Sequence, residues 1–177
     1  MQVDVHIQWD LDGVVQSSTP LAEDVLRQAH QITAVAWQSW FQQWFECLQP
    51  SISPIQTYEL SLLLTDDAAI QNLNATYRHL DHPTDVLAFA TLDLTDQPTN
   101  LWSEMPVELG DIIISVETAA RQAQEQQHTL QLELAWLATH GLLHLLGWDH
   151  PTSERLQEML AQQQSLINVI NVSAVTG

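Results

Sequence analysis

Residues 139–150 read Thr-His-Gly-Leu-Leu-His-Leu-Leu-Gly-Trp-Asp-His. His140 and His144 are four residues apart, so a helix would present both imidazoles on one face. Gly147 ends that helix, and its freedom at positive φ allows a sharp reversal that can return His150 to the same point. Three neutral imidazoles around a divalent ion leave a fourth position for water, as in catalytic zinc sites. The stretch therefore predicts a metal centre on His140, His144 and His150.

The same stretch also bears on the kind of chemistry. Its spacing, H-x-x-x-H-x-x-G-x-x-H, is that of the metzincin metalloproteases, in which a glutamate that serves as general base follows the first histidine. This chain has Gly141 at that position. Glycine cannot take a proton from water, so the sequence disfavours a peptidase.

Periodicity and capping residues divide the rest of the chain into strands and helices. Apolar patterns predict strands over 3–9, 58–65, 86–90 and 109–115. Helices, counted with their capping residues, are expected from 20 to 48 with interruptions, and over 66–77, 115–127, 129–146 and 152–169. Loops are expected at 78–85 and 93–106. No repeat or linker divides the chain, so we expect a single domain over 1–177, with 171–177 as a short flexible tail.

Helical spacing predicts that certain apolar side chains lie in the core and that clustered glutamines face solvent. A wide apolar stripe is predicted to lie in the core, and it consists of Trp37, Trp40, Phe41, Trp44, Phe45 and Leu48. The glutamine clusters at 124–127 and 162–164 are expected on solvated helix faces.

The charge balance excludes several classes of partner. The chain has 22 acidic and 4 basic residues, no lysine, and a net charge of −18. A basic DNA- or RNA-binding module needs several cations on phosphates, and a helix on anionic lipid needs a basic face. We therefore expect neither DNA nor membrane as a partner, whereas one local site for an anion remains possible.

Cysteine usage and hydropathy indicate the compartment. Cys47 is the only cysteine, so no disulfide can form within the chain, which fits a reducing environment. The N-terminal residues alternate apolar and charged side chains, unlike a signal peptide, and no run approaches 18 apolar residues. A cytoplasmic protein is expected.

Two further segments accompany the histidine stretch. One contains Leu73-Asn74, Tyr77-Arg78 and the run from Asp81 to Phe89, Asp-His-Pro-Thr-Asp-Val-Leu-Ala-Phe; the other is Leu-Gly-Asp-Ile-Ile-Ile-Ser at 109–115. Together with 140–150, and in the same order, they resemble the signature segments of the YbeY family, the bacterial rRNA-maturation endoribonucleases. The resemblance extends from about Leu73 to His150, and the N-terminal third matches only in the order of its elements.

The resemblance implies a fold, a cofactor and an activity. The fold is α+β, with a small mixed β-sheet of about four strands packed against several helices, a metalloprotease-like zinc helix and the metal in a cleft. One Zn²⁺ per chain would be bound by His140, His144 and His150, and Arg78 would be catalytic. The implied activity is cleavage of single-stranded RNA in maturation of the small-subunit rRNA 3′ end and in ribosome quality control. The implied partners are the rRNA precursor and the small ribosomal subunit or its proteins.

The chain departs from the family pattern at two places. His79-Leu80 stands where Gly-Lys is usual, which removes one cation, and Pro151 stands where an acidic residue is common. With so few cations, we expect binding to free RNA to be weak and salt-sensitive, and productive binding to need a partner that presents the strand.

The implied residues suit phosphodiester chemistry. Zinc lowers the pKa of a bound water to about 7, so hydroxide is available without a protein base at Gly141. The Arg78 guanidinium can bind two phosphate oxygens at once, and its alternative role is an ion pair with one of the 22 acids.

Other polar residues have less definite roles. Asp149 is equally a support for a ligand imidazole or a turn residue before His150. Asp85 and Asp111 can hold a ligand, Arg78 or a loop. The remaining five histidines are interpreted as turn, surface or structural residues, and they are His6, His30, His79, His82 and His128.

Two other functions remain open. One is a metal-dependent hydrolase of another substrate, such as a peptide or a small phosphoester. The other is a ribosome-assembly factor without catalytic activity, in which the zinc is structural. Three histidine ligands rather than four favour an open, catalytic position.

Overall fold

A computed structural model of the chain describes residues 1–11, 20–91, 104–170 and 172. Strands and helices are interspersed along it, and their bounds are β1 (Gln2–Asp10), α2 (Pro20–His30), α3 (Ala34–Leu48), β2 (Thr57–Thr65), α4 (Asp67–Arg78), β3 (Val86–Ala90), β4 (Val107–Ser115), α5 (Val116–Gln126), α6 (Leu130–Leu145) and α7 (Ser153–Val169). Most of the loop expected at 93–106 and, apart from Val172, the tail expected at 171–177 lie outside the described residues. None of the described helices is long and apolar enough to cross a membrane.

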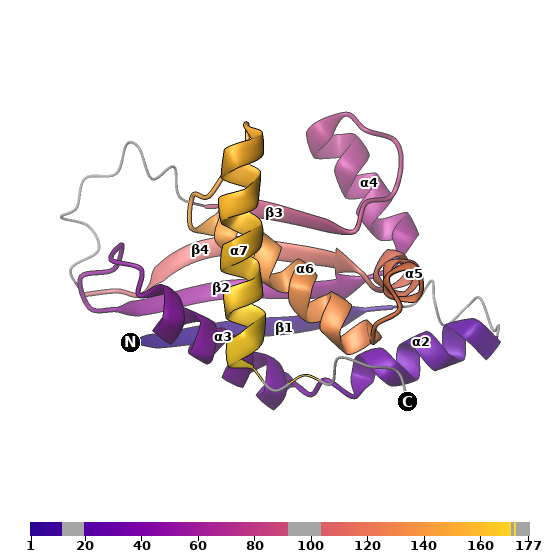
Figure 1. The fold of residues 1–177 in the computed structure, drawn as a ribbon, viewed down its shortest axis with the longest axis horizontal. Helices are drawn as coiled ribbons and strands as arrows, with labels where there is room; N and C mark the ends of the chain where they lie inside the picture. Colours follow the sequence, from indigo (N-terminus) through magenta and orange to yellow (C-terminus); the bar gives the residue numbers. More distant parts are fainter. Residues whose placement is uncertain (12–19, 92–103, 171, 173–177) are drawn as a thin grey trace.

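The four strands form one mixed sheet in the order β1-β2-β4-β3. β1 and β4 both pair with β2 in parallel, with Leu62 opposite Ile112. β3 pairs with β4 in the antiparallel direction, with Val86 opposite Ile114, so β3 forms one edge of the sheet (Figure 1). This confirms the expected α+β fold with a small mixed sheet.

The two faces of the sheet are covered by different helices. Side chains alternate between faces along a strand. Ile112 and Ile114 of β4 belong to the main core with α6, whereas Ile113 packs with Ile70 of α4 in a smaller cluster. In Figure 1, α6 runs obliquely across the sheet and α7 crosses in front of it. The elements α4 and α6 therefore lie on opposite faces and meet around the edge strand β3.

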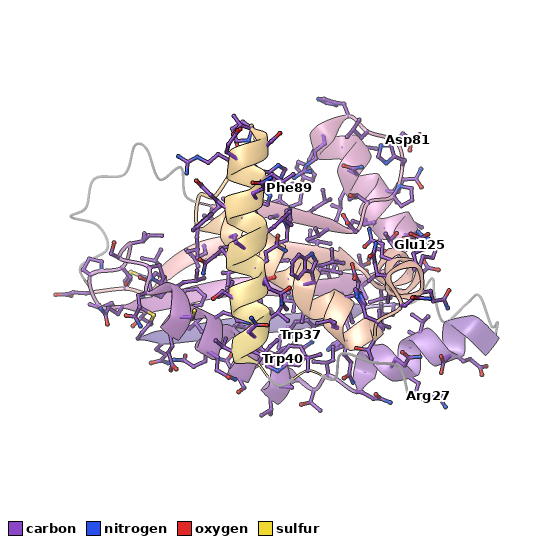
Figure 2. All side chains as sticks on the ribbon, viewed as in Figure 1. Arg27, Trp37, Trp40, Asp81, Phe89 and Glu125 are labelled. Carbon is purple, nitrogen blue, oxygen red and sulfur yellow. The ribbon has the colours of Figure 1, made fainter. Side chains whose placement is uncertain are left out.

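The aromatic stripe of α3 is in the core, as predicted. Trp37, Phe41, Trp44 and Phe45 are fully buried, while Trp40 is half-buried (Figure 2). The burial of one such aromatic side chain contributes about 2–3 kcal/mol, so the stripe is a major source of stability. The same helix also anchors α7, because the Trp44 indole Nε1–H donates to the backbone oxygen of Leu166 at 3.0 Å.

Capping residues set the helix boundaries. The side chains of Asp66, Ser115, Thr129 and Thr152 each accept a backbone N–H from the first turn of α4, α5, α6 and α7, respectively. These interactions satisfy N–H groups that have no partner within the helix. All four helix starts were predicted from the sequence.

Candidate metal centre

Three histidine side chains converge at the C-terminal end of α6. His140 and His144 lie one turn apart on α6, and their Nε2 atoms are 3.1 Å apart. His150, in the segment after α6, has its ring centroid 5.7 Å from that of His140 and 5.4 Å from that of His144. One ring nitrogen from each residue lies within 4.8 Å of the other two. The three side chains could therefore form a metal site.

A Schellman motif returns the chain to His140 and His144. Gly147 has φ +84°, the left-handed conformation that glycine adopts without strain. Its N–H donates to the backbone oxygen of His144 at 3.0 Å, and the N–H of Trp148 donates to that of Leu143 at 2.9 Å. The Asp149 carboxylate then accepts the backbone N–H of His150 at 2.8 Å. Asp149 thus makes the contact expected of a turn residue.

A buried glutamine from α7 orients His140. The Gln163 Oε1 atom lies 3.2 Å from His140 Nδ1, and Gln163 Nε2 donates to the backbone oxygen of Trp136 at 3.2 Å. The second contact fixes Oε1 as the atom facing the ring, so Nδ1 carries the proton and Nε2 keeps its lone pair toward the other histidines. The expectation that 162–164 form a solvated face is wrong for Gln163, which is fully buried.

Burial favours neutral imidazoles at this site. It lowers the pKa of His140, against the opposing effect of the Gln163 hydrogen bond. Burial also lowers the pKa of His144, and the neighbouring charges of His140 and His150 act in the same direction. A neutral imidazole nitrogen is the form that binds a metal ion. The donor set therefore fits a borderline ion such as zinc, for which imidazole is a preferred ligand.

Gly141 lies where α6 approaches the sheet most closely. A Cβ atom at this position would lie 2.7 Å from Ile112 Cγ2 of β4, which is closer than real Cβ contacts. The space that a side chain at Gly141 would need is thus filled by the core. The structure supplies a packing reason for the glycine that replaces the metzincin glutamate.

Arg78 and the histidines line one cleft. This cleft has a volume of about 460 Å³, and its lining residues are Arg78, Thr84, Asp85, Val86, Ala88, His140, Gly141, His144, Asp149 and His150. The exposed arginines Arg27, Arg121 and Arg155 each form an ion pair with a carboxylate. Arg78 forms no ion pair within the part of the chain that the structure describes. Its guanidinium is available to an anion in the cleft.

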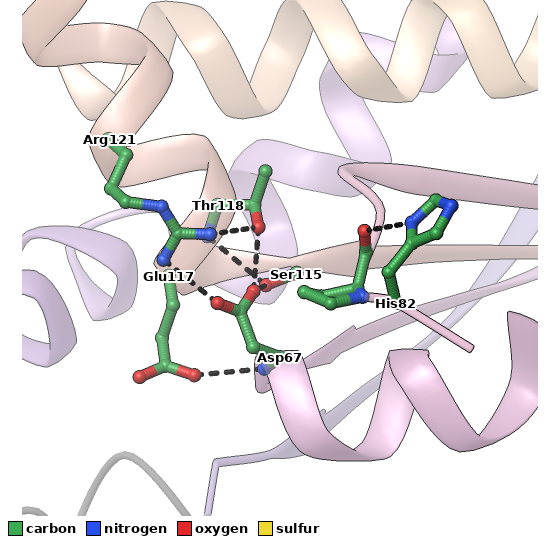
Figure 3. A network of polar contacts seen from close by, with 7 residues as sticks. Asp67, His82, Ser115, Glu117, Thr118 and Arg121 are labelled. Atoms are coloured by element: carbon green, nitrogen blue, oxygen red, sulfur yellow. Dashed lines mark hydrogen bonds and ion pairs between the residues drawn. The ribbon is translucent and has the colours of Figure 1, made fainter. Parts of the chain in front are cut away.

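A polar network anchors the opposite end of α4 (Figure 3). The Asp67 carboxylate accepts hydrogen bonds from Ser115 and Thr118, at 2.5 and 2.6 Å, and pairs with Arg121 at 2.8 Å. The backbone N–H of Asp67 donates to Glu117 at 2.9 Å. Burial alone would raise the pKa of Asp67, but the hydrogen bonds and Arg121 outweigh it and lower that pKa. The network joins α4 to α5 and so fixes the helix that carries Arg78.

The C-terminal end of α4 is held by a different set of contacts. His79 adopts a left-handed conformation with φ +60°, and Leu80 N–H donates to the backbone oxygen of Asn74 at 3.3 Å. The Asn74 side chain, almost fully buried, donates to the backbone oxygen of His82 at 2.9 Å. His79 and His82 are not among the residues that line the cleft. Arg78 thus projects from a helix that is fixed at both ends.

The two candidate aspartates differ in position. Asp85 lines the cleft; its carboxylate accepts the N–H of Val86 at 2.8 Å and the side-chain amide of Gln122 at 3.0 Å. Asp111 is exposed on β4 opposite Phe89 and is not among the lining residues. Of the two, only Asp85 is placed to act in the cleft.

A larger hollow adjoins the cleft at Asp85. It has a volume of about 810 Å³ and lies between α5, α6 and α7. It contains the contact between His128 and Glu133, and burial raises the pKa of Glu133 against the opposing effect of His128. None of the three clustered histidines lines it. The candidate site is therefore the smaller cleft.

A mixed sheet, three histidines that could hold a metal and an arginine in the same cleft define an α+β protein with a metal-type site. The family model described as Endoribonuclease YbeY matches residues 24–171. The chain is 85% identical to the Endoribonuclease YbeY of Acaryochloris marina over 177 residues, which cover 99% of each chain. It is 46% identical to that of Trichormus variabilis over 175 residues, covering 97% of this chain and 96% of the relative. The chain belongs to the YbeY family.

One solved structure has a similar fold. The solution structure of TM1509 from Thermotoga maritima matches with a TM-score of 0.51 and 21% sequence identity, covering 94% of this chain and 88% of that chain. At this level of identity the match supports the arrangement of the elements.

Proposed function

We propose that this protein is a zinc-dependent endoribonuclease that cleaves single-stranded RNA in rRNA processing. Its relatives in Acaryochloris marina and Trichormus variabilis are named Endoribonuclease YbeY. The observation that carries the proposal is that Arg78 and the three histidines line the same cleft. A phosphodiester is an anionic substrate that could contact a metal ion and a guanidinium at once.

In this proposal His140, His144 and His150 bind one Zn²⁺. When bound, zinc would supply a Lewis acid for a phosphoryl oxygen and would bring the pKa of water close to neutrality. Gln163 keeps the His140 proton on Nδ1 and thereby directs Nε2 to the metal position. Asp149 holds the backbone at His150 and so places the third imidazole.

Arg78 is the proposed catalytic residue of the chain. Its guanidinium binds two phosphate oxygens and stabilises the negative charge that develops as the phosphodiester is cleaved. Gly141 carries no group that could serve as a base, and Ile112 fills the space beside it. This arrangement supports phosphodiester chemistry over peptide hydrolysis.

The proposed setting is maturation of the small-subunit rRNA 3′ end and ribosome quality control, in the cytoplasm, by a chain that forms a single domain. A net charge of −18 repels free RNA at long range, but screening over about 8 Å at physiological salt leaves the local cleft effective. The small ribosomal subunit or its proteins are the proposed partners that present the strand.

The test is cleavage of an rRNA precursor fragment by the purified protein. Zinc-loaded protein, chelator-treated protein and a His144→Ala variant are compared, and bound metal is measured for each. Of the three samples, we expect only the zinc-loaded wild-type protein to cleave the RNA and to contain about one zinc per chain. Cleavage that survives His144→Ala would contradict the proposal. So would a folded zinc-loaded protein that cleaves the fragment neither when it is free nor when it is part of the small ribosomal subunit.

A further inference from the structure

We propose that Tyr77, supported by Phe89, forms a stacking site for one nucleobase of the RNA strand at the rim of the cleft. The ligand class rests on the function proposed above. Tyr77 would bind a base beside the cleft that, in the proposed function, acts on the phosphate.

Tyr77 differs from the other aromatic side chains in its exposure. It is 63% exposed, and it is the one aromatic residue among the exposed large hydrophobic side chains of the described part of the chain. The aromatic residues of α3 show the opposite behaviour, since Trp37 and Phe41 are fully buried. Burial in the core therefore does not account for Tyr77, whose ring remains largely exposed.

The Tyr77 ring contacts one neighbouring aromatic ring and is otherwise largely exposed. The centroids of Tyr77 and Phe89 are 5.1 Å apart with an interplanar angle of 62°, an edge-to-face contact. Such a contact restricts the ring without covering both of its faces. A base that stacks on Tyr77 would meet a ring that is already oriented, which reduces the entropic cost of binding.

The position of the pair relative to the cleft follows from the edge strand. Phe89 packs with the cluster under α4, whereas Ala88, the preceding residue of β3, lines the cleft on the other face. Phe89 is labelled in Figure 2, and β3 forms the upper margin of the sheet in Figure 1. Tyr77 directly precedes Arg78 at the end of α4. A strand whose phosphate binds Arg78 could therefore cross the β3 edge and place a neighbouring base on Tyr77.

The shortage of positive charge favours a contribution from base stacking. Arg78 is the one arginine among the residues that line the cleft, and the chain contains no lysine. Leu80, two residues beyond Arg78 and 46% exposed, adds apolar surface but no charge. Affinity for single strands comes from phosphate contacts and from base stacking, which contributes about 1–3 kcal/mol per base. With so few cations available, base stacking would be a second source of affinity.

Stacking on tyrosine accepts any base, because every base has a π-face. The site would therefore contribute affinity and strand placement without reading sequence. It would also favour single strands, since a paired base is already stacked within its own helix.

The test is binding of a 2′-O-methyl RNA oligonucleotide to the zinc-loaded protein. The 2′-O-methyl groups prevent cleavage by the 2′-hydroxyl, and gel electrophoresis after each measurement checks that water has not cleaved the strand. Tyr77→Ala should raise the Kd about tenfold, which corresponds to about 1.4 kcal/mol. Tyr77→Phe should have the same Kd as wild type, because phenylalanine keeps the aromatic ring. Val35→Ala, which truncates another exposed side chain (78% exposed) on α3, is the matched control and should change nothing. The slope of log Kd against log salt should be the same for Tyr77→Ala and wild type, because no phosphate contact is lost.

A single abasic nucleotide moved along the oligonucleotide identifies the stacked base. At one position the abasic substitution should weaken wild-type binding about as much as Tyr77→Ala does, and it should have no further effect in that variant. Equal Kd values for Tyr77→Ala and wild type would overturn the stacking site. It would also be overturned if, at every position, the abasic nucleotide raised the Kd of Tyr77→Ala by the same factor as that of wild type. A wild-type protein that cleaves RNA while showing either result would overturn this inference alone. A wild-type protein that neither binds nor cleaves RNA would overturn the proposed function as well.

Discussion

Gln163 of α7 contacts His140 of α6 across the helix interface, with 3.2 Å between Gln163 Oε1 and His140 Nδ1. The contact is possible because Gln163 is fully buried and its own N–H group donates to Trp136 O. A residue that binds no metal itself thus determines which nitrogen of His140 is available. The orientation of His140 in the candidate metal site therefore depends on how α7 packs against α6.

Replacement of Gln163 by leucine should weaken metal binding. Leucine has a similar volume but accepts no hydrogen bond, so His140 loses the group that fixes its tautomer and ring orientation. Loss of such an outer contact typically costs about 10–100-fold in metal affinity. Competition with a chromophoric chelator measures the zinc Kd. Gln164→Leu, at the exposed neighbouring position, is the control; equal zinc affinity of both variants and wild type would contradict the role of Gln163.

Substitution of Gly141 by alanine should destabilise the fold. The new Cβ would lie 2.7 Å from Ile112 Cγ2, so α6 or the Ile112 side chain must shift. Overpacking of this kind costs about 1–3 kcal/mol, and the better helix propensity of alanine offsets about 1 kcal/mol of that cost. Urea unfolding measures the free energy change.

Ile112→Ala provides the partner for a double-mutant cycle with Gly141→Ala. The two substitutions should be less destabilising together than the sum of their separate effects, because truncation of Ile112 removes the clash. Additive effects would show that the close contact between α6 and β4 is not what requires the glycine.

Substitution of Arg78 should reduce RNA cleavage without unfolding the protein. Arg78 is exposed and has no ion pair among the described residues, so alanine removes little packing. Removal of one group that stabilises transition-state charge typically lowers the rate about 10²–10³-fold. Arg78→Lys should recover only part of the activity, because an ammonium group cannot bind two oxygens in the same planar way.

Arg155→Ala is the control for loss of one positive charge. Arg155 pairs with Glu158 and does not line the cleft of the histidines. Single-turnover cleavage rates and thermal melting are measured for each variant. A rate for Arg78→Ala equal to that of Arg155→Ala would exclude a catalytic role for Arg78.

Replacement of Asp67 by asparagine should make the stability of the protein less dependent on acidic pH. The pKa of Asp67 is lower in the folded protein than its ordinary value of 3.8, because hydrogen bonds from Ser115 and Thr118, together with Arg121, outweigh burial. The ionised carboxylate therefore stabilises the fold above pH ~4, and this contribution disappears as the pH falls through the folded pKa. Asp67→Asn should cost about 1–3 kcal/mol at pH 7.

The difference in unfolding free energy between wild type and Asp67→Asn should shrink as the pH is lowered from 6 to 2. Urea unfolding at each pH provides the measurement. Asp24→Asn, which breaks an exposed ion pair with Arg27, is the control and should cost less than about 1 kcal/mol. A difference for Asp67→Asn that stays constant with pH would contradict the assignment.

The sequence predicts the local elements well, and the reasons lie in particular residues. Four helix starts are marked by capping residues, namely Asp66, Ser115, Thr129 and Thr152. The predicted ends of the strands fall within one or two residues of those of β1, β2, β3 and β4. The order β1-β2-β4-β3 follows from packing between distant segments, which local patterns do not encode. The family resemblance predicted a small mixed sheet but no strand order.

The sequence predicted some residues of the candidate site better than others. Spacing alone was sufficient to group His140, His144 and His150, because helix geometry and a glycine turn dictate their convergence. The placement of Arg78 depends on α4 packing on the opposite face of the sheet, and only the resemblance indicated it. Gln163 was missed, although a signal existed: it shares the buried face of α7 with Met159 and Leu166.

The three histidines and Arg78 come together at different stages of the structure, because α4 and α6 meet only around the β3 edge. A chain folded only around α6 and its turn would gather the three histidines, since they lie within residues 140–150. It would not bring Arg78 to them, because that requires the finished sheet with helices on both faces. In the function proposed for this cleft, an immature chain could capture a metal ion before it could cut RNA. In that case, a chain that is still folding during its synthesis would not cleave the cell's transcripts.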